Sequence, residues 1–495
     1  MSQNLPALLI VVPMILAPLA ALVGRWRAAW VVALGASWWA FGCAMVLLQR
    51  VRADGVIHYS LGGWAAPTGI EYRIDLASAF VAVIVTTIAA IAVPYARTSI
   101  QQELSDDRGG LFYAAFILSM TGLLGIAITG DVFNVFVFLE ISSLSAYSMI
   151  AVGRDRRALT AAYQYLIMGS VGASFIVIGI GLLYVTTGTL GMMDLAQRIP
   201  EVMASGQGDR TLAVAFTFLT VGITLKLALF PLHLWLPNAY TYAPSAVTAF
   251  MASTSTKVSV YLLLRFFFTI FGEAFSFGEM RLNMVLMPLA LVSILAMSLV
   301  AIYQENIKRL LAFSSVAQIG YMILGISFGS VLGVTAGILH LFNHALMKGA
   351  LFMAMGCVMY RVGSVRLDRM AGLGREMPWT MAAFVGGGLS MIGVPLTVGF
   401  VSKWYLVQAA LEQDRWLVAA LVMVGSLMAL IYIWKVVEVA YFQRRDPEDS
   451  VQEAPLSLLI PTWVLVAASF WFGIDGTTTA EVATQAAQTL LGVMP

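Results

Sequence analysis

The residues of this sequence best suited to chemistry are charged side chains inside long apolar segments. Lys226, Lys257 and Lys403 each lie within a different apolar run. A charged ammonium at the centre of a membrane-spanning helix costs about 2.5 kcal/mol or more. It is tolerated if it faces protein or water, pairs with an acid, or gives up its proton. Each of these solutions makes the lysine a group that can handle protons.

Prolines interrupt two of the three lysine-bearing segments. The first reads KLALFPLHLWLP from Lys226, and the second reads GVPLTVGFVSKW around Lys403. A break at membrane depth is tolerated only where the freed backbone lines a buried or hydrated cavity. Corresponding breaks in two halves of a chain are typical of inverted-repeat transport folds. His233 lies in the first break, where it either belongs to a proton path or caps the broken helix.

Glu140 is a carboxylate near the middle of another apolar segment. Such an acid should be protonated, hydrated or paired with a cation on a neighbouring helix, and we expect Lys226 to be its partner. A structural ion pair that locks two helices together is the alternative interpretation. Asp131 stands at the edge of the same segment, where an interfacial or helix-start role is expected.

His340, His344 and Lys348 recur every fourth residue and therefore share one face of a helix. Two histidines at this spacing could bind a metal ion, but no third ligand of the HExxH kind follows, and a lysine continues the face. A proton relay fits better, because histidine exchanges protons near neutral pH. Satisfied core histidines are the structural alternative. We expect no metal and no cofactor in this chain.

The composition indicates a helical protein that crosses the membrane many times. Of the 495 residues, 60% are hydrophobic and only 11% are charged, whereas soluble proteins carry about 25% charged residues. A membrane span needs about 20 mostly apolar residues. Fourteen such segments are expected, at 5–23, 30–48, 75–95, 110–129, 131–151, 161–188, 211–230, 245–270, 283–303, 308–328, 331–359, 379–410, 416–441 and 455–473. The Gly-rich segment 55–73 between the second and third spans is a candidate surface hairpin.

The distribution of basic residues predicts the orientation in the membrane. Connections after odd-numbered spans hold fifteen of the 28 Lys and Arg residues, and connections after even-numbered spans hold seven. The positive-inside rule therefore predicts that the odd connections are cytoplasmic and that both termini are outside. Six basic residues fall within spans, among them Arg265, which is expected to extend to the surface, and Lys435, which is expected to pair locally with Glu438. The absence of a presequence favours a prokaryotic plasma membrane.

Several motifs together resemble the antiporter-like subunits that Mrp-type cation/proton antiporters share with respiratory complex I and membrane-bound hydrogenases. The motifs are TGDVFNVFVFLE up to Glu140, K-x4-P-L-H-x-W-L-P-x-A-Y from Lys226, S-T-K up to Lys257, H-x3-H-x3-K from His340, and G-V-P-x4-F-V-S-K up to Lys403. The resemblance covers spans four to thirteen. The chain length, the first motif and a lysine at position 403 are most similar to the D subunits of the Mrp type.

The resemblance implies a fold of fourteen helices with two inverted five-helix repeats and breaks in helices seven and twelve. It implies N-terminal helices one to three in 1–96, a first repeat in 110–270, a second repeat in 283–441, and a last helix with a tail in 455–495. It also implies a Glu–Lys pair at Glu140 and Lys226, a bridging Lys257, relay histidines His340 and His344, and a terminal Lys403. Such subunits work within larger membrane complexes and carry no redox centre.

Three functions are consistent with these residues. The first is a proton-translocating subunit of a multisubunit Na+/H+ antiporter, and its closest variant is a proton-pumping subunit of a complex I-like dehydrogenase or membrane-bound hydrogenase. The second is a stand-alone transporter for a small solute, since broken helices with a midplane site suit that too. The third is a scaffold or quinone-site subunit whose buried ions are structural. For the first function we expect other membrane subunits as partners, and protons and a sodium ion as the transported ions. None of the three functions involves nucleic acid.

Overall fold

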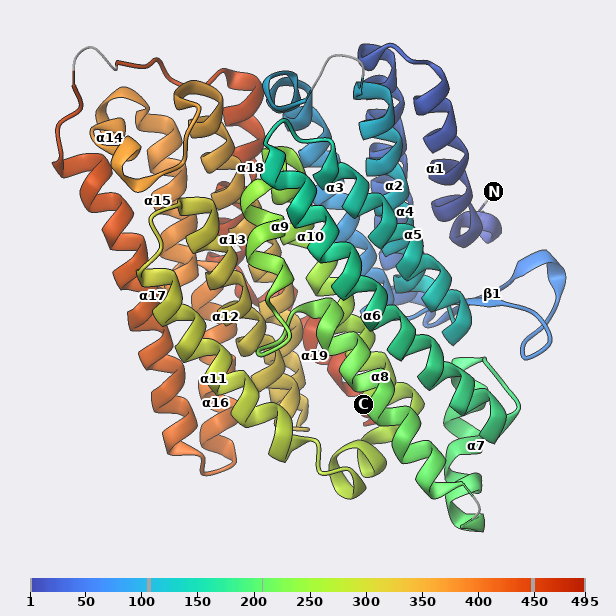
Figure 1. Ribbon diagram of the computed structural model, residues 1–495. Helices are drawn as coiled ribbons and strands as arrows, with labels where there is room; N and C mark the ends of the chain where they lie inside the picture. Colours follow the sequence, from blue (N-terminus) through green and yellow to red (C-terminus); the bar gives the residue numbers. More distant parts are fainter. Residues whose placement is uncertain (1, 105–107, 207, 447–449, 494–495) are drawn as a thin grey trace.

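Long apolar helices form nearly the whole protein (Figure 1). The computed structural model describes residues 2–104, 108–206, 208–446 and 450–493. Within these ranges thirteen helices are long and apolar enough to cross a membrane. They are α1 (Leu5–Leu22), α2 (Trp26–Asp54), α3 (Leu76–Glu103), α4 (Gly109–Ile128), α5 (Val132–Ala151), α6 (Arg156–Thr187), α8 (Asp209–Leu227), α10 (Ser245–Leu264), α11 (Asn283–Ile302), α12 (Ile307–Ser327), α13 (Val331–Val362), α17 (Trp416–Phe442) and α18 (Leu456–Ile474).

The remaining predicted span consists of two short helices rather than one long helix. These are α15 (Pro378–Ile392) and α16 (Val398–Glu412), each of 15 residues, on either side of the proline break. The seventh span is broken in the same way, because α8 ends at Leu227 and α9 (Trp235–Tyr242) follows the break. The predicted class, an all-α polytopic membrane protein with about fourteen spans and breaks in the seventh and twelfth, is confirmed.

The two broken helices hold equivalent places in two runs of five spans. Each break falls in the fourth span of its run, first in α4–α10 and then in α11–α17. The inverted relation between the runs and the four predicted segments 1–96, 110–270, 283–441 and 455–495 stay predictions. Residue 1 and residues 494–495, at the two ends of these segments, lie outside the described residues.

Smaller elements occupy the connections and the C-terminal end. Strands β1 (Ile57–Ser60) and β2 (Glu71–Ile74) pair antiparallel with Ile57 opposite Ile74, so the candidate hairpin is present. Two amphipathic helices were not predicted, α7 (Met192–Ser205) and α19 (Gly476–Leu490), because neither is apolar enough to be recognised as a span. The other short elements are η1 (Ser2–Asn4), η2 (Leu61–Gly63), η3 (Arg265–Ile270), η4 (Ala274–Glu279), η5 (Leu367–Met370) and α14 (Leu373–Glu376).

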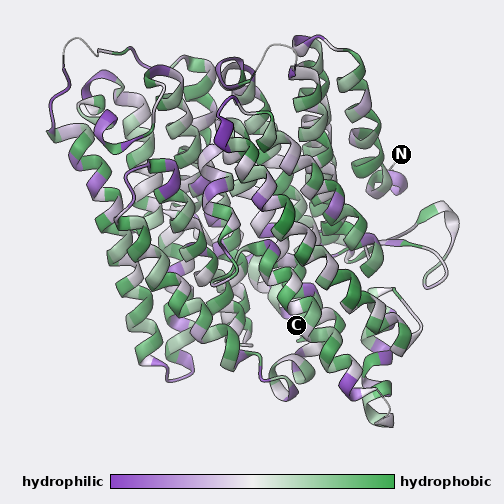
Figure 2. Cartoon of the chain, in the orientation of Figure 1, coloured by the Kyte–Doolittle hydropathy of each residue, from purple (hydrophilic) through white to green (hydrophobic). Residues whose placement is uncertain are grey.

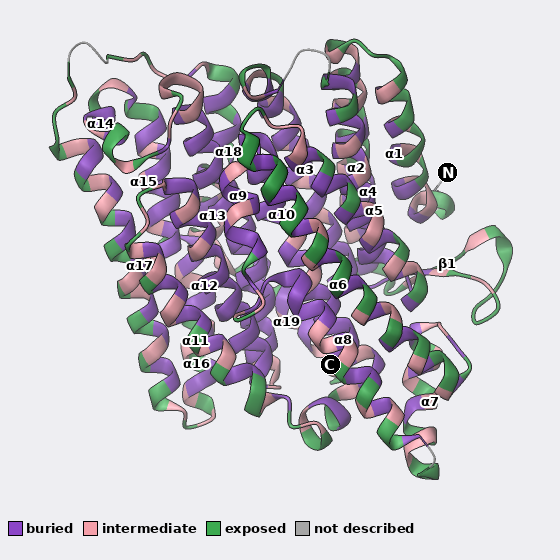
Figure 3. Ribbon diagram, in the orientation of Figure 1, coloured by how far each residue is buried: buried purple, intermediate pink, exposed green. Residues whose placement is uncertain are grey.

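Helix α13 lies at the centre of the bundle. It packs against α10, α12, α15, α16, α18 and α19, and Figure 3 shows the central helices as mostly buried while α1, α6 and α17 expose much of their surface. Figure 2 shows apolar colour along the helices and polar colour mainly at their ends. A helix surrounded by protein can carry polar groups that a lipid-facing helix cannot, so α13 can hold two histidines and a lysine.

Close helix contacts bring α6 and α8 together beside Lys226. A Cβ atom added at Gly222 would lie 2.8 Å from the carbonyl oxygen of Gly172, so the two backbones almost touch. Small residues at such positions are the usual means of helix packing in membranes. This contact places the last turn of α8 deep inside the protein.

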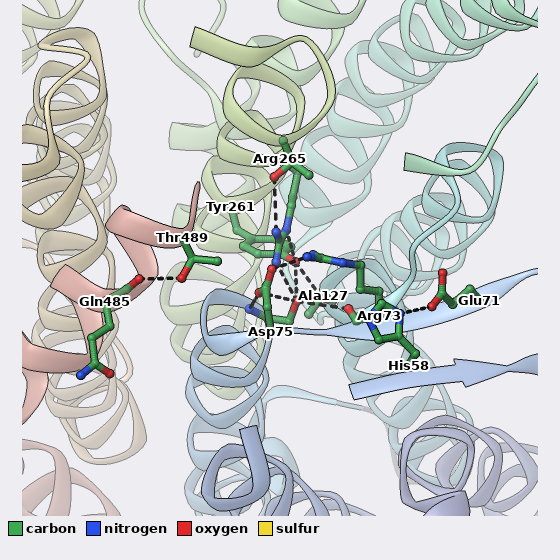
Figure 4. Close-up of polar contacts among 11 residues, drawn as sticks. His58, Glu71, Arg73, Asp75, Ala127, Tyr261, Arg265, Gln485 and Thr489 are labelled. Atoms are coloured by element: carbon green, nitrogen blue, oxygen red, sulfur yellow. Dashed lines mark hydrogen bonds and ion pairs between the residues drawn. The ribbon is translucent and has the colours of Figure 1, made fainter. Parts of the chain in front are cut away.

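A buried ion pair between α3 and α10 was not predicted. Arg265 does not extend to the surface; its guanidinium pairs with Asp75, which caps the N-terminus of α3. Arg265 also donates to Ser78 Oγ at 2.8 Å and to the Tyr261 hydroxyl at 2.7 Å. Figure 4 shows Arg265 together with Asp75 and Tyr261. Tyr261 in turn donates to the carbonyl of Ala127 on α4. The network therefore ties three helices together at the C-terminal end of α10, the helix that carries Lys257.

We predict that Asp75→Asn lowers the free energy of unfolding by about 3–5 kcal/mol, because it leaves Arg265 buried without its counter-ion. Burial alone would raise the pKa of the Asp75 carboxyl, but the guanidinium groups of Arg265 and Arg73 hold it well below its usual range. The carboxylate therefore stabilises the fold fully above its unfolded pKa of about 4, and this stabilisation is lost as the pH falls below that value. Thermal unfolding in detergent between pH 7 and pH 3 measures both effects.

The matched control is Asp155→Asn, because Asp155 pairs with Arg157 at 2.8 Å on the surface of the protein. An exposed pair contributes about 0–1 kcal/mol. Equal stability of the two variants would contradict a stabilising role for the Asp75 pair.

Candidate functional site

The carboxylate of Glu140 and the ammonium of Lys226 meet between α5 and α8. Lys226 Nζ lies 3.2 Å from Glu140 Oε1 and donates to Ser143 Oγ at 3.0 Å. The lysine side chain is 5% exposed and the glutamate side chain 26% exposed. The expected pair is therefore present, with its cation buried and its acid at the side of the bundle.

The break after α8 holds Lys226 in place. Helix α8 ends one residue after the lysine, and Ala228 takes the left-handed conformation with φ 63°. The indole nitrogen of Trp235 donates to the carbonyl of Leu225 at 3.0 Å, and its ring stacks on Tyr165 at 3.9 Å between centroids. A helix C-terminus presents partial negative charge, so the last turn is a favourable place for an ammonium.

A small polar cavity extends from this pair toward α10. It has a volume of about 20 Å³ and is lined by Lys226, by serines of α5 and α10 (Ser142, Ser143, Ser255 and Ser259), and by aliphatic side chains of α4, α5 and α10. A cavity of this size holds about one water molecule, and the hydroxyl groups supply its hydrogen-bond partners. The cavity therefore lies between Lys226 and α10, the helix that carries Lys257.

Lys257 is buried and bonded only to oxygens of its own helix among the described residues. Its ammonium contacts the carbonyl of Ala252 and donates to Thr256 Oγ1 at 3.3 Å. Helix α10 packs against α8, which carries Lys226, and against α13, which carries His340 and His344. Lys257 therefore stands between the first lysine and the polar face of α13.

The polar face of α13 joins three helices. The His340 ring is hydrogen-bonded to Ser402 of α16 through Nδ1 and to Gln318 of α12 through Nε2, both at 2.9 Å. The His344 ring lies parallel to it, with centroids 6.2 Å apart and planes within 7°. Both nitrogens of His344 are buried without a protein partner within the described ranges. Water normally satisfies such groups, which indicates hydration at this point.

Lys348 continues this face toward the side of the protein where the connections after odd-numbered spans lie. These connections hold most of the basic loop residues, so this side is called the basic side. Its Nζ donates to the carbonyl of Leu311 at 2.8 Å and contacts Ser314 Oγ, both on α12. The side chain is fully buried. It therefore joins α13 to the first half of α12.

Lys403 lies at the second broken helix. Its Nζ donates to the carbonyls of Met391 at 2.9 Å and Ile392 at 3.0 Å, the last residues of α15, and lies 4.9 Å above the Tyr321 ring. The helix end and the aromatic face both favour a cation there. Gly393 ends α15 with φ +90°, and a Cβ atom at this position would lie 3.0 Å from Lys403 Cδ.

Two other predicted polar residues lie apart from these contacts. His233 is buried in the first break with its ring 5.5 Å from that of Phe230 and its Nδ1 unpartnered among the residues described. Asp131 accepts from the backbone nitrogen of Asn134 at 2.7 Å and caps α5, as a helix-start residue does. Burial raises the pKa of the Asp131 carboxyl.

The local pairing of Lys435 with Glu438 was wrong. Lys435 instead donates to the carbonyls of Ile302 at 3.0 Å and Gln304 at 3.2 Å at the end of α11. A lysine three residues from a glutamate predicted the pair, but a neighbouring helix end offers two carbonyls that sequence spacing cannot reveal.

Sequence reasoning also missed Lys308, which was counted as a residue of a cytoplasmic connection. It is only 1% exposed and donates to the carbonyl of Ala243 at 3.2 Å. The adjacent Arg309 has a partly exposed environment. A helix that starts at Ile307 would have predicted that Lys308 and Arg309 differ in burial, because consecutive helical residues point in different directions.

We predict that Trp235→Phe lowers the free energy of unfolding by about 0.5–1.5 kcal/mol. The smaller ring can still stack on Tyr165, but the buried carbonyl of Leu225 loses the indole donor and keeps only the backbone N–H of Ala228, at 3.2 Å. Thermal unfolding of the purified protein in detergent measures the change. Trp404→Phe is the control, since Trp404 is exposed and stacks only on Phe400; equal losses in the two variants would contradict a capping role for Trp235.

Comparison with known proteins identifies the family. Residues 129–429 match the family model described as NADH:quinone oxidoreductase/Mrp antiporter, TM. The chain is 40% identical to NADH-quinone oxidoreductase subunit N of Desulforudis audaxviator over 94% of each chain. It is 28% identical to the D subunit of the Na(+)/H(+) antiporter of Alkalihalophilus pseudofirmus over 90% of this chain and 89% of the relative.

A solved structure has the same architecture. The fold superposes on a chain of the Mrp complex from Dietzia sp. with a TM-score of 0.89 at 25% identity, covering 99% of this chain and 97% of the other. The region matched by the family model, residues 129–429, contains both broken helices and the polar residues from Glu140 to Lys403. The chain is a multi-pass membrane protein that belongs to the NADH:quinone oxidoreductase/Mrp antiporter family.

Proposed function

We propose that this chain is the proton-translocating subunit of a multisubunit Na+/H+ antiporter in a prokaryotic plasma membrane. Its proton path is the row formed by Glu140, Lys226, Lys257, the polar face of α13 and Lys403. The observation that carries the proposal is the Glu140–Lys226 pair at 3.2 Å, with a polar cavity leading from it toward α10. It is supported by the relative from the Na(+)/H(+) antiporter and by the Mrp complex chain.

The lysines of the row differ in their hydrogen-bond partners, and this difference determines how readily each one holds a proton. Lys226 has a carboxylate beside it, whereas the bonds of Lys257 are to a carbonyl and a hydroxyl. A nearby acid favours the charged form of a buried lysine, and burial without an acid favours the neutral form. When Glu140 takes up a proton, Lys226 loses that support, and its own proton can move through the cavity to Lys257.

The remaining groups extend the path to the second broken helix. His344 and His340 lie on the same face of α13, which packs against the helix of Lys257. Ser402, the neighbour of Lys403 in the chain, is hydrogen-bonded to His340. Imidazole can accept a proton on one nitrogen and release one from the other, which suits it to this intermediate position. Lys348 and His233 are proposed as accessory groups of the same path.

A second candidate function is supported by the 40% identical relative, which is an NADH-quinone oxidoreductase subunit N. In a redox-driven complex the same row would move protons in response to electron transfer in another subunit. Both candidates place the coupling machinery on partner chains, so this chain works within a hetero-oligomeric membrane complex in either case.

The orientation belongs to the proposal as well. The basic connections that follow odd-numbered spans would face the cytoplasm, and both termini would lie outside. The sodium ion would leave the cell in exchange for protons that enter it. A solute transporter that works as a single chain is disfavoured, because relatives over nearly the full length are named as subunits.

We predict that Lys226→Ala, Lys257→Met and Lys403→Met each reduce proton translocation by the assembled complex to about a tenth or less of the wild-type rate. Each removes one proton-binding group from the row. Initial rates in vesicles, normalised to the amount of assembled complex, measure the effect. Lys435→Met is the matched control, because Lys435 caps α11 outside the row. Undiminished transport in the three row variants would refute the proposed path.

A separate experiment chooses between the two driving forces. In vesicles that contain the complex and lack respiratory substrates, an imposed sodium gradient is expected to drive proton movement, and Lys226→Ala is expected to abolish it. Fluorescence of an internal pH indicator records the response. Proton movement that requires a quinone and an electron donor, with no response to sodium, would favour the redox-driven complex instead.

A further inference from the structure

A large polar hollow opens on the basic side of the protein. It consists of a cavity of about 240 Å³ and an adjoining one of about 580 Å³, which share Asp155, Thr241, Tyr242 and two residues at the end of α13. Their linings come from connections that follow spans three, five, seven, nine and eleven. Together they have room for many water molecules.

Glu103 and Lys308 line the smaller cavity. Glu103 ends α3, and Lys308 lies in the first turn of α12. Lys308 is only 1% exposed although it lines this cavity, so it lies on the wall that faces the interior of the bundle.

The two residues hold one turn of the chain between them. Lys308 Nζ donates to the carbonyl of Ala243 at 3.2 Å, and Glu103 Oε2 accepts from the backbone nitrogen of Ser245 at 2.8 Å and from its hydroxyl at 3.2 Å. This turn connects α9 to α10, the helix of Lys257. A change in charge at Glu103 or Lys308 would therefore be felt at the start of that helix.

Further along α12 from Lys308, residues of this helix are hydrogen-bonded to the polar face of α13, which belongs to the proposed row. Leu311 and Ser314, three and six residues further on, both accept from Lys348. Gln318, ten residues further on, is bonded to His340. At a rise of 1.5 Å per residue, Ser314 lies about 9 Å and Gln318 about 15 Å from Lys308 along the helix axis. A distance of about 15 Å is half the thickness of the hydrocarbon core, which is the depth expected for the row.

We propose that Glu103 and Lys308 form the entrance through which protons pass between the basic-side hollow and the mid-membrane row. The inference rests on the proposed function and adds residues to its path. A proton from water in the cavity binds a carboxylate oxygen of Glu103. Its protonation removes the carboxylate that favours the Lys308 ammonium, which then gives one proton by way of water and Ser314 to a neutral Lys348. The neutral amine of Lys308 takes the proton from Glu103, again by way of water, so the entrance returns to its starting charge.

The other titratable groups around the smaller cavity are Arg154, Asp155 and Tyr242. Arg154 and Asp155 are exposed to solvent, and Asp155 is paired with Arg157. The entrance therefore depends on the one acid and the one lysine whose hydrogen bonds reach the α9–α10 turn.

The test compares Glu103→Gln, Lys308→Met and Lys308→Arg in the assembled complex. All three are expected to reduce proton translocation about 10-fold or more and to change its dependence on the pH of the basic side. Lys308→Arg is the decisive variant: it retains a cation that can bond to Ala243, but arginine does not release its proton. A purely structural lysine would be replaced by arginine without loss of transport.

Glu305→Gln is the control, because Glu305 is on the wall of the larger cavity, 72% exposed, and pairs with Arg366 at 3.3 Å. It is expected to transport at the wild-type rate. Full transport by Lys308→Arg, or by Glu103→Gln in a complex that assembles normally, would overturn the proposal. If these variants transport normally while Lys226→Ala does not, the entrance is wrong and the proposed function stands; if Lys226→Ala also transports normally, the proposed function itself fails.

A labelling experiment tests the entrance without any transport assay. A cysteine at Ser314 is expected to react with a membrane-impermeant thiol reagent from the basic side faster in Lys308→Ala than in the parent, since the shorter side chain opens the way inward. The native Cys43 and Cys357 are buried and give a low background. Equal reaction rates in the two backgrounds would show that Lys308 does not close this route and would overturn its role as the entrance.

Discussion

The free-energy cost of placing an ammonium group away from water governs the interior of this protein. Each of the buried lysines Lys226, Lys257, Lys348 and Lys403 has oxygen atoms as hydrogen-bond partners, but a carboxylate is present only at Lys226 among the described residues. Carbonyls and hydroxyls satisfy the hydrogens of an ammonium without neutralising its charge. Such a lysine is poised between its charged and neutral forms, and a small change in a neighbouring charge can decide which form prevails.

The two broken helices provide the electrostatic setting, and the second also provides carbonyl oxygens for its lysine. An unbroken helix uses its carbonyls internally, whereas a helix that ends inside the bundle exposes its last carbonyls to a cation. Lys226 lies in the last turn of α8, and Lys403 binds the last carbonyls of α15. The glycine and proline residues at the breaks therefore contribute to the cation sites, because they end the helices inside the bundle. The buried α13 between the breaks carries the histidines that join the two halves.

Sequence reasoning predicted the Glu140–Lys226 pair because charged residues are rare inside apolar spans. Glu140 is the only acid in the middle of its span, so its pairing with a lysine on a neighbouring span followed from cost alone. The fourteen spans and the two breaks followed from length, apolar composition and prolines. Amphipathic α7 and α19 escaped detection because they are neither apolar enough nor long enough to resemble a span.

The contacts that sequence reasoning missed all depend on partners far away in the chain. Arg265 is 190 residues from Asp75, and nothing local distinguishes it from an arginine that reaches the surface. Lys308 bonds to Ala243, 65 residues earlier, and Lys435 bonds to Ile302, 133 residues earlier. In each case the position of a residue along its helix was predictable, but the direction of its side chain was set by packing.

The claim on which this account depends is that the buried charges form one hydrated row rather than isolated structural pairs. A high-resolution electron cryo-microscopy map of the chain within its complex tests it most directly. We expect ordered water in the cavity between Lys226 and α10 and at both ring nitrogens of His344, continuing to Lys403. Dry apolar packing between these groups, with each lysine enclosed by its own helix, would contradict the account.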